Sequence, residues 1–405
     1  MQIRTQRVKA LRWLGSMLIV ILVGGYIVRA VDRTLPLLQP TTPVLLLMRP
    51  TAALKLAWPS EQAAVGIVGT SILKTHGVQK PTATASTAKL ITALSVLHAR
   101  PLAAGQHGPT VALSAADVAL YNTYKAEDGS VVAVKVGERI SEYEMLEAML
   151  LPSANNMADS LARWAFGSLH AYITFANSYV RHLGLAHTHV GGDASGFSPN
   201  TTSTASDLVR LGELAMRSPV LAHIVGQTTA TGIPVVGTVR NTNALLRTSG
   251  IVGVKTGNTT QAGGVFIVAA ETTVNANPAT IVTAVLGAPT LVGAFHISLP
   301  LVRSAEASFR PATIIIAGTV VGQYRLPWGG RAAAIASKTL VVDAWDGVVI
   351  PVIITLHPVR ADAHAGQAVG NLAAAATILA GKHMIALTLK AAPSKASLWW
   401  RLVHP

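Results

Sequence analysis

Cysteine is absent from all 405 residues of the chain. The protein therefore has no disulfide, no thiolate ligand for zinc and no cysteine nucleophile. The 13 histidines form no His-Glu-x-x-His pattern or similar ligand spacing, so the sequence predicts no metal site. Aromatic residues are also scarce, at 5%, and the basic residues are scattered rather than interleaved with them. This pattern argues against a nucleic-acid partner.

Acidic residues are few as well. Asp and Glu number 18 against 32 Lys and Arg, which gives a formal net charge of +14. Such an excess of positive charge favours anionic partners, such as a membrane surface or an anionic wall polymer. Half of the residues are hydrophobic, which is enough for a large core and predicts more than one domain.

The N-terminus has the pattern of a signal anchor. Four cations lie within its first 12 residues, namely Arg4, Arg7, Lys9 and Arg12. The uncharged run Trp13–Val28 follows, slightly shorter than the ~20 residues that span a bilayer, and Arg29 can lengthen it by extending its charge to the interface. Positive charge before the run predicts that residues 1–32 form an uncleaved transmembrane segment, with the rest of the chain extracytoplasmic. A cleaved signal peptide is the alternative.

Composition divides the remainder of the chain. A proline-rich stretch predicts a linker over 33–50, and mixed helix and strand patterns predict a catalytic domain over 51–311. Short alternating runs with glycine turns predict a β-rich domain over 312–393. The tail, 394–405, holds Trp399 and Trp400 beside basic residues, which suits a membrane interface. A tail docked on the protein is the alternative.

Three short motifs within 51–311 carry the candidate chemistry. In chain order they are Ser86-x-x-Lys89, Ser153-x-Asn155 and Lys255-Thr256-Gly257. Each is weak alone, because a second Ser-x-x-Lys occurs in "SILK" and a second Ser-x-Asn in "FSPN". The three together, in this order and each in a suitable local pattern, form a strong signal.

The first motif opens the apolar-periodic run "STAKLITALSVLHAR", which predicts a helix beginning at Ser86. Residues three apart share one face of a helix, so Lys89 lies within reach of the Ser86 hydroxyl. Lys89 can act as its base if burial and a nearby cation, for which Lys255 is the candidate, lower the pKa of the amine. The free N–H of Ser86 at the helix start can stabilise an oxyanion.

The other two motifs suit supporting roles. Ser153 follows the predicted helix "ISEYEMLEAMLL", which opens with a capping box, and its hydroxyl can relay a proton. Asn155 offers an amide to a substrate carbonyl or to the lysine. On a strand, Lys255 and Gly257 face the same side, with Lys255 ready for a carboxylate and Gly257 leaving room for a substrate backbone.

These motifs, with "EMLEAMLLPSANNMA", "GGDASGFSPNTTSTASDLVRLGELA" and "NTNALLRTSGIVGVKTGNT", resemble the D-alanyl-D-alanine carboxypeptidases of serine peptidase family S11, the low-molecular-mass penicillin-binding proteins. The resemblance implies an α/β (α+β) catalytic domain like that of β-lactamases and transpeptidases, with a five-stranded antiparallel sheet flanked by helices. A small all-β C-terminal domain would follow, and the N-terminal helix would cross the membrane. The resemblance also assigns the N–H groups of Ser86 and Asn258 to the oxyanion hole. Asn156 departs from the family, which often has aspartate there.

The implied reaction removes the terminal D-alanine from peptidoglycan pentapeptides through an acylated Ser86, without a cofactor. β-Lactam antibiotics would acylate the same serine. A D-alanyl-D-alanine endopeptidase remains an alternative, since it would cut beside D-alanine with the same site. A class A β-lactamase is less favoured, because no glutamate lies between Glu147 and Glu213 to activate a deacylating water. A non-catalytic wall-binding protein is the third alternative.

Overall fold

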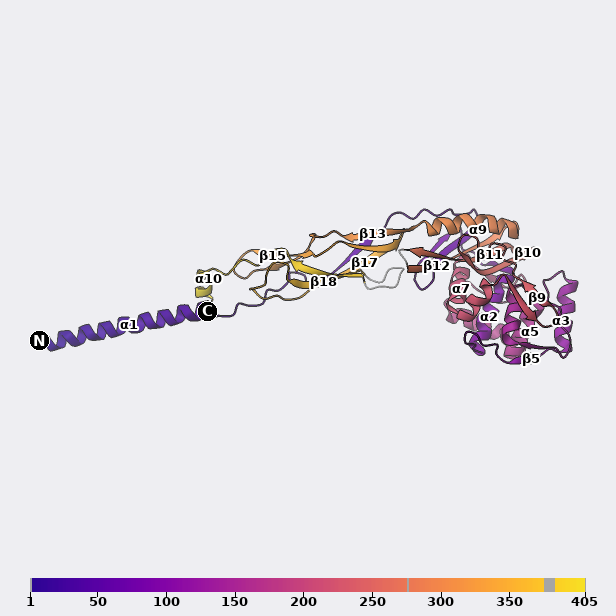
Figure 1. The fold of residues 1–405 in the computed structure, drawn as a ribbon, viewed down its shortest axis with the longest axis horizontal. Coiled ribbons are helices and arrows are strands. Elements are labelled where there is room, and N and C mark those ends of the chain that lie inside the picture. The colour runs from indigo at the N-terminus through magenta and orange to yellow at the C-terminus, as the bar shows by residue number, and fades with distance from the viewer. Residues whose placement is uncertain (1, 275–276, 375–382, 405) are drawn as a thin grey trace. The chain divides into compact units, whose positions relative to one another are not determined.

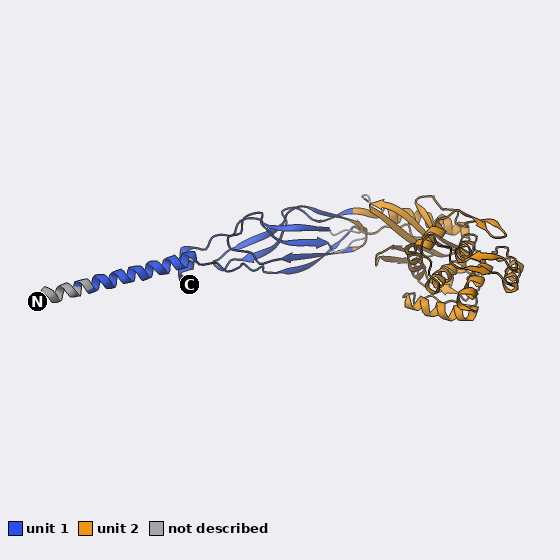
Figure 2. Ribbon diagram, turned by 60° about the horizontal axis from the view of Figure 1, so that its bottom comes forward, with its two compact units in different colours: residues 1–51, 311–342, 349–405 blue, residues 52–310, 343–348 orange. Residues whose placement is uncertain are grey.

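The computed structural model describes residues 2–274, 277–374 and 383–404, without the side chains of 2–8 and 10. The chain forms two compact units (Figure 2). One unit comprises 52–310 and 343–348, and the other comprises 1–51, 311–342 and 349–405. The cations Arg4 and Arg7 of the expected anchor lie outside the described side chains.

A five-stranded antiparallel sheet organises the unit built around 52–310, as expected. Its strand order is β10-β11-β12-β2-β3. The bounds are Ile251–Thr259 for β10, Gly263–Val274 for β11, Asn277–Ala288 for β12, Gln62–Ile67 for β2 and Leu73–His76 for β3. Adjacent long strands share a continuous register, with Lys255 opposite Ile267 and Gly257 opposite Val265. The edge strand β10 therefore holds the third motif in a fixed position.

Helices cover both faces of this sheet because side chains alternate along its strands. Val265 and Ile267 of β11 pack into a large core that includes α7 (Ala205–Arg217) and α8 (Pro219–Gly226). Phe266 and Val268 pack on the opposite face beside α9 (Leu291–Glu306). Figure 1 shows α9 and α7 on opposite sides of the sheet.

A helical layer completes this unit and carries the first two motifs. The 3₁₀ helix η1 (Ala85–Ala88) leads into α2 (Lys89–Ala99), so the expected helix begins as a 3₁₀ turn. The other helices are α3 (Ala115–Ala126), α4 (Glu142–Leu150), α5 (Asn155–Phe166) and α6 (Leu169–His182). The capping box before α4 is confirmed: Ser141 accepts from the Glu144 N–H at 3.2 Å, and Glu144 accepts from the Ser141 N–H at 2.7 Å.

Short strand pairs brace the loops of this unit. They are β4 (Thr82–Ala83) with β7 (Thr202–Ser203), β5 (Thr110–Ala112) with β6 (Arg139–Ser141), and β8 (Thr229–Ile233) with β9 (Gly237–Arg240). The β4–β7 pair joins the segment just before η1 to the chain just after the loop 193–198. That pairing brings two distant stretches of sequence to the same place.

The second unit is β-rich and contains a six-stranded sheet in the order β1-β17-β18-β19-β15-β14. The bounds are Val44–Pro50 for β1, Val320–Arg325 for β14, Arg331–Ala336 for β15, Val349–Leu356 for β17, Ala368–Ala374 for β18 and His383–Leu389 for β19. The remaining strands of the described residues, β13 (Phe309–Ile315) and β16 (Leu340–Trp345), pair with each other in a two-stranded sheet. The expected linker over 33–50 is wrong in its second half, because 44–50 pairs with β17 as an edge strand.

Helix α1 spans Gln2–Asp32, and its segment Leu11–Asp32 is long and apolar enough to cross a membrane, with a mean hydropathy of 2.1. Only 6% of the apolar window of this segment is buried within the protein. The terminal helix α10 (Leu398–Val403) lies against its C-terminal end, where Arg401 donates to the Val31 carbonyl at 2.7 Å. Trp399 remains 72% exposed.

Candidate active site

The Ser86–Lys89 pair has the geometry of a nucleophile and its base. Lys89 Nζ lies 2.8 Å from Ser86 Oγ, 2.7 Å from Asn155 Oδ1 and 3.0 Å from the Ser195 carbonyl oxygen. Two of these three partners can only accept hydrogen bonds. When Lys89 is neutral, its two N–H groups can satisfy Asn155 and Ser195, which leaves the lone pair directed at the Ser86 hydroxyl.

Burial adapts Lys89 to this role. The side chain is fully buried, and the loss of solvation lowers the pKa of Lys89 from 10.5 to about 7, while Asp193 and Asp159 act in the opposite direction. A lysine with this pKa has a substantial neutral fraction at physiological pH. Its ammonium form in turn helps burial to lower the pKa of Lys255.

The second and third motifs meet through a hydrogen bond. Lys255 Nζ donates to Ser153 Oγ at 3.0 Å and to the Thr256 carbonyl at 3.1 Å. A protonated Lys255 has three N–H donors. The two described hydrogen bonds use two of them, so the third can bind a substrate carboxylate. Thr256 Oγ1 lies 2.6 Å from Thr242 Oγ1, a contact that fixes its side chain on β10. Lys255 is thus a buried amine joined to Ser153, with its pKa lowered by burial, whereas the sequence suggested a lysine waiting unpaired.

The structure shows a packing reason for glycine at position 257, which the sequence did not predict. A Cβ at this position would lie 3.0 Å from the Thr84 carbonyl oxygen, 3.0 Å from Ala85 Cβ and 3.1 Å from the Ser86 nitrogen. The missing side chain therefore allows β10 to approach the backbone of η1. The next residue, Asn258, is exposed at this edge and continues the pairing of β10 with Gly264 of β11.

The hydrogen bonds of Asn156 explain why this position holds asparagine rather than the aspartate frequent in the family. Its side-chain oxygen accepts from the Val132 N–H at 3.0 Å, and its amide nitrogen donates to the Val132 carbonyl at 2.9 Å. Only an amide can both donate and accept in this way, since a carboxylate has no donor. Asn156 thereby holds the loop beside the site, while Asn155 reaches Lys89.

The structure adds two features that the motifs did not reveal, the Ser195 carbonyl on Lys89 and the buried carboxylates around it. The second Ser-x-x-Lys and the second Ser-x-Asn motifs make other hydrogen bonds. Lys74 of the first donates to the Gly347 carbonyl, and Ser198 Oγ of the second accepts from the Asn200 N–H. Within the part of the chain that the structure describes, no three His, Asp or Glu side chains gather in a way that would hold a metal ion.

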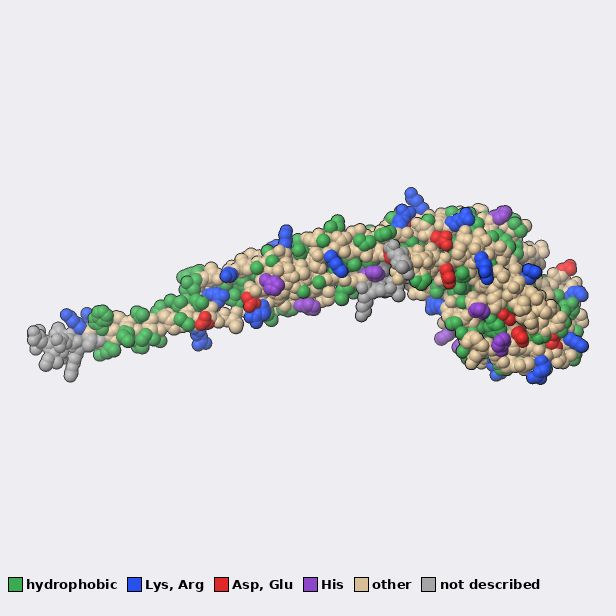
Figure 3. All heavy atoms as spheres, viewed as in Figure 1, with side chains coloured by type: hydrophobic (Ala, Val, Ile, Leu, Met, Phe, Trp, Pro, Cys, Tyr) green, Lys and Arg blue, Asp and Glu red, His purple; other side chains and the backbone are tan. Residues whose placement is uncertain are grey.

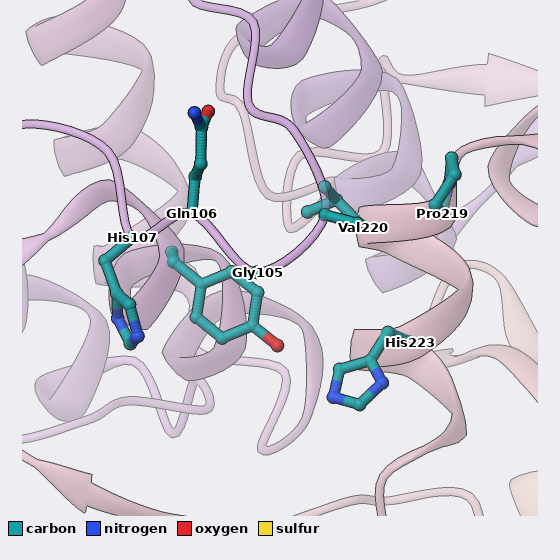
Figure 4. Close-up of a pocket in the computed structure, with 8 residues that line it drawn as sticks. Gly105, Gln106, His107, Pro219, Val220 and His223 are labelled. Carbon is teal, nitrogen blue, oxygen red and sulfur yellow. The ribbon is translucent and has the colours of Figure 1, made fainter.

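A separate cavity of about 400 Å³ lies between the loop 104–107 and α8, with His107 and His223 among its lining residues (Figure 4). Its lining includes Tyr143, whose ring meets the His107 ring edge-on at 5.4 Å, but none of the eight predicted site residues.

On the face shown in Figure 3, Lys and Arg side chains are scattered singly rather than gathered in a stripe.

Known proteins with similar sequences or folds are consistent with this geometry. The chain is 28% identical over 205 residues to the D-alanyl-D-alanine carboxypeptidase DacD of Salmonella typhimurium, a match covering 50% of this chain and 51% of the relative. It is 34% identical over 156 residues to a D-alanyl-D-alanine endopeptidase of Pseudomonas aeruginosa, covering 37% and 49%. The chain thus spans about half the length of the curated relatives it matches.

The structural matches agree on the catalytic unit. A D-alanyl-D-alanine carboxypeptidase from Mycobacterium tuberculosis superposes with a TM-score of 0.55 at 25% identity, covering 64% of this chain and 96% of that one. A Streptomyces DD-transpeptidase has the same fold, with a TM-score of 0.53 at 23% identity over 63% and 98%. The sequence profile described as D-alanyl-D-alanine carboxypeptidase, peptidase family S11, matches residues 63–290. The chain belongs to this family.

Proposed function

We propose that the protein is a serine-type D-Ala-D-Ala carboxypeptidase that removes the terminal D-alanine from peptidoglycan pentapeptides. The observation that carries the proposal is the contact of Lys89 Nζ with Ser86 Oγ at 2.8 Å, made by a lysine whose pKa burial lowers to about 7. Family membership and the bond between Lys255 and Ser153 support it.

Acylation would follow from these positions. Ser86 Oγ attacks the carbonyl carbon of the D-Ala–D-Ala bond while Lys89 accepts the hydroxyl proton. The N–H groups of Ser86 and Asn258 stabilise the oxyanion, and Asn155 holds the substrate near Lys89. The bond to the terminal D-alanine then breaks, and the proton returns through the Ser153 hydroxyl to the leaving amine. Water finally releases the shortened peptide from Ser86.

Lys255, Thr256 and Gly257 would bind the substrate end of the cleft. A carboxypeptidase must recognise a free terminal carboxylate, and the Lys255 ammonium has a donor available for it beyond its bonds to Ser153 and Thr256. A β-lactam antibiotic presents a carboxylate beside a strained amide, so it would occupy the same place and acylate Ser86. No step requires a cofactor.

An endopeptidase is the second candidate, favoured by the 34% identity to the Pseudomonas aeruginosa endopeptidase over 156 residues. A β-lactamase is less well supported. Glu213 pairs with Arg210 at 2.7 Å. Burial raises the pKa of Glu147, against a hydrogen bond with Gln227 that lowers it. In the part of the chain that the structure describes, neither glutamate has a hydrogen bond to a predicted site residue.

We place the protein at the cell membrane with its catalytic unit extracytoplasmic. The segment Leu11–Asp32 supports an N-terminal anchor, and the positive charge that precedes it favours an N-terminus inside the cell. A peptidoglycan substrate requires this orientation, and the net charge of +14 favours an anionic envelope.

Labelling with a fluorescent penicillin tests the nucleophile. We expect one adduct, on Ser86, and complete loss of labelling in Ser86→Ala without a change in thermal unfolding. The matched control is Ser71→Ala, which removes the serine of the other Ser-x-x-Lys motif and should label normally. An adduct on Ser71 would show that the wrong motif was chosen, and no adduct at all would favour a non-catalytic wall-binding protein.

Substitution of Lys255 separates the two peptidase candidates. A charged hydrogen bond contributes about 1.5–3 kcal/mol, so Lys255→Ala should lower kcat/KM on a D-Ala–D-Ala peptide by about 10- to 100-fold. Lys255→Arg should retain part of the activity because it keeps the charge. Amidating the C-terminus of the substrate should impair the wild type and matter little to the alanine variant. If the wild type cuts amidated and free-acid peptides equally, it is an endopeptidase.

A further inference from the structure

Lys89 is hydrogen-bonded to a buried polar network that lies outside the three motifs. The loop 193–198 supplies the Ser195 carbonyl that accepts from Lys89 at 3.0 Å. Within the loop, Asp193 accepts from the N–H and hydroxyl of Ser195, both at 2.7 Å, and from the Ser198 N–H at 2.6 Å. The loop is therefore folded around its own carboxylate.

A second carboxylate attaches this loop to the helical layer. Asp159, on α5, is 2% exposed. One of its oxygens accepts from the Ala194 N–H at 2.8 Å, and the other accepts from the Tyr124 hydroxyl of α3 at 2.7 Å. The Ala194 carbonyl accepts from Thr92 of α2 at 2.6 Å. Ala194, the residue before Ser195, is thus held at its N–H by Asp159 of α5 and at its carbonyl by Thr92 of α2, and Tyr124 of α3 in turn holds Asp159.

The loop 193–198 packs closely against its neighbours. Gly196 adopts φ +73°, and a Cβ there would lie 2.1 Å from the Ala85 carbonyl oxygen, so the loop lies directly on η1. The ring of Phe197 meets the ring of Tyr124 edge-on, with centroids 5.6 Å apart. A displacement of Ala194 would therefore move the Ser195 carbonyl against Lys89.

We propose that Asp159, together with Tyr124, is a positioning residue for acylation: it fixes the loop 193–198 so that the Ser195 carbonyl orients the Lys89 amine toward Ser86. The proposal rests on the proposed function and deepens it. It also extends the site to α3 and to the second turn of α5, beyond Asn155. Asp159 acts through Ser195 and through its negative charge on Lys89.

The negative charge of Asp159 affects the pKa of Lys89 in a known direction. The ionisable groups that face Asp159 are Tyr124 on α3, Lys89 at the start of α2, Tyr172 on α6 and Asp193 in the loop. Burial raises the pKa of Asp159 to about 6 against its hydrogen bonds with Tyr124 and Ala194, so the group is mainly ionised at neutral pH. An anion there favours the ammonium form of Lys89 and opposes the effect of burial.

Asp159→Asn and Tyr124→Phe separate the charge from the hydrogen bond. Asp159→Asn retains an acceptor for the Ala194 N–H but removes the charge. We expect the acid limb of the pH profile for penicillin acylation to move to lower pH by about one unit, because Lys89 loses its proton more easily. Tyr124→Phe keeps the carboxyl group but removes a hydrogen bond that lowers the pKa of Asp159. The comparison is therefore made at about pH 8 and above, where Asp159 is ionised, and there acylation should fall about 3- to 10-fold.

Asp117→Asn is the matched control. Asp117 also joins α3 to α5, where it accepts from the Ser160 hydroxyl at 2.7 Å, but it makes no contact with the loop 193–198 in the described structure. Its profile should coincide with that of the wild type. A profile of Asp159→Asn that coincides with the wild type, or an equal shift in Asp117→Asn, would overturn the proposal.

A second measurement keeps the result independent of catalysis. The pKa of Lys89 can be followed by NMR in protein carrying carbon-labelled lysine, and it should fall in Asp159→Asn. If penicillin does not acylate the wild type, the proposed function fails, while this titration still decides whether Asp159 acts on Lys89. If Asp159→Asn does not fold, Tyr124→Phe decides, and an unchanged acylation rate in that variant would refute the positioning role.

Discussion

Lys89 is the residue on which the proposed chemistry depends, and its protonation gives the first prediction. Burial lowers the pKa of Lys89 to about 7, and only the neutral amine can accept the Ser86 proton. The rate constant for acylation should therefore rise with pH, with an acid-limb midpoint near 7 and a fall of about tenfold per unit below it. Penicillin labelling across the range of about pH 5 to 9 measures this profile. A rate that increases as pH falls would exclude a neutral Lys89 as the base.

Asn156 gives a prediction that runs against the family pattern. Asn156→Asp removes the donor to the Val132 carbonyl and places a carboxylate against that oxygen, in a fully buried position. The free energy of unfolding should fall by about 1–3 kcal/mol at neutral pH, and by less at acid pH, where a protonated carboxyl can donate again. Urea unfolding at the two pH values provides the measurement.

The control for this change is Asn200→Asp, since Asn200 is exposed. That substitution should alter stability by less than about 0.5 kcal/mol. If Asn156→Asp were as stable as the wild type, the two hydrogen bonds to Val132 would not explain why asparagine occupies this position.

The residues of the site were largely predictable, but their partners were not. The contacts of Lys89 with Ser86 and Asn155 are the ones that the motifs suggested, because those motifs specify side chains. The bond between Lys255 and Ser153 was not expected. The carbonyl of Ser195 left no such signal, because any residue can supply a backbone oxygen. Buried acids such as Asp159 resemble solvated acids until the tertiary packing around them is known.

At the scale of elements, the site depends on the approach of β10 to η1. Gly257 permits this contact, since a Cβ would lie within 3.1 Å of three atoms of residues 84–86. Gly257→Ala should push the strand from the nucleophile and lower penicillin acylation by about 10-fold or more, because a small misplacement of reacting groups has a large effect on rate. Thermal unfolding should show a smaller change than acylation.

Gly192→Ala serves as the comparison for Gly257→Ala. A Cβ at Gly192 would meet Ser198 at 3.5 Å, an ordinary contact, and Gly192 lies on the adjacent loop. Its acylation rate should stay within about twofold of the wild type. Equal losses in both variants would show that any added methyl near the site disturbs it, and that β10 has no special contact with η1.

Elements with strong local signals were predicted well, whereas β1 was not. Ser141 and Glu144 form the expected capping box because both groups lie within one turn. Strand β1 is flanked by prolines and mostly exposed, so its sequence resembles a linker. Pro50 ends the strand at a sheet edge, which is where a strand tolerates proline. Only the pairing with β17 reveals it.

At the scale of the whole molecule, the β-rich unit is assembled from distant parts of the chain. Its sheet pairs β1, from residues before the catalytic unit, with β17, from residues after it. Periodicity reports how a segment behaves locally but not which segment will pair with it. The five-stranded sheet was expected because the family resemblance supplied its topology, and no equivalent information covered this second sheet.

The last prediction concerns membrane attachment. Leu11–Asp32 has a mean hydropathy of 2.1 with only 6% of its apolar window buried, so lipid is the natural solvent for this helix. The full chain should sediment with membranes and resist extraction by alkaline carbonate, whereas a variant that begins at Thr34 should be released in active form. Trp399, 72% exposed on α10, can still bind the interface weakly. Membranes should therefore retain part of the shortened protein in dilute buffer but none after carbonate.

Trp399→Ser in the full chain is the matched control for the deletion. It removes the aromatic side chain of α10 but leaves α1 intact, so carbonate should still fail to extract it. Extraction of this variant would assign the attachment to the tail. N-terminal sequencing of the membrane-bound protein supplies the opposing test: a chain that begins near Val31 would mean that the apolar segment is a cleaved signal, and attachment would then have to come from α10 alone.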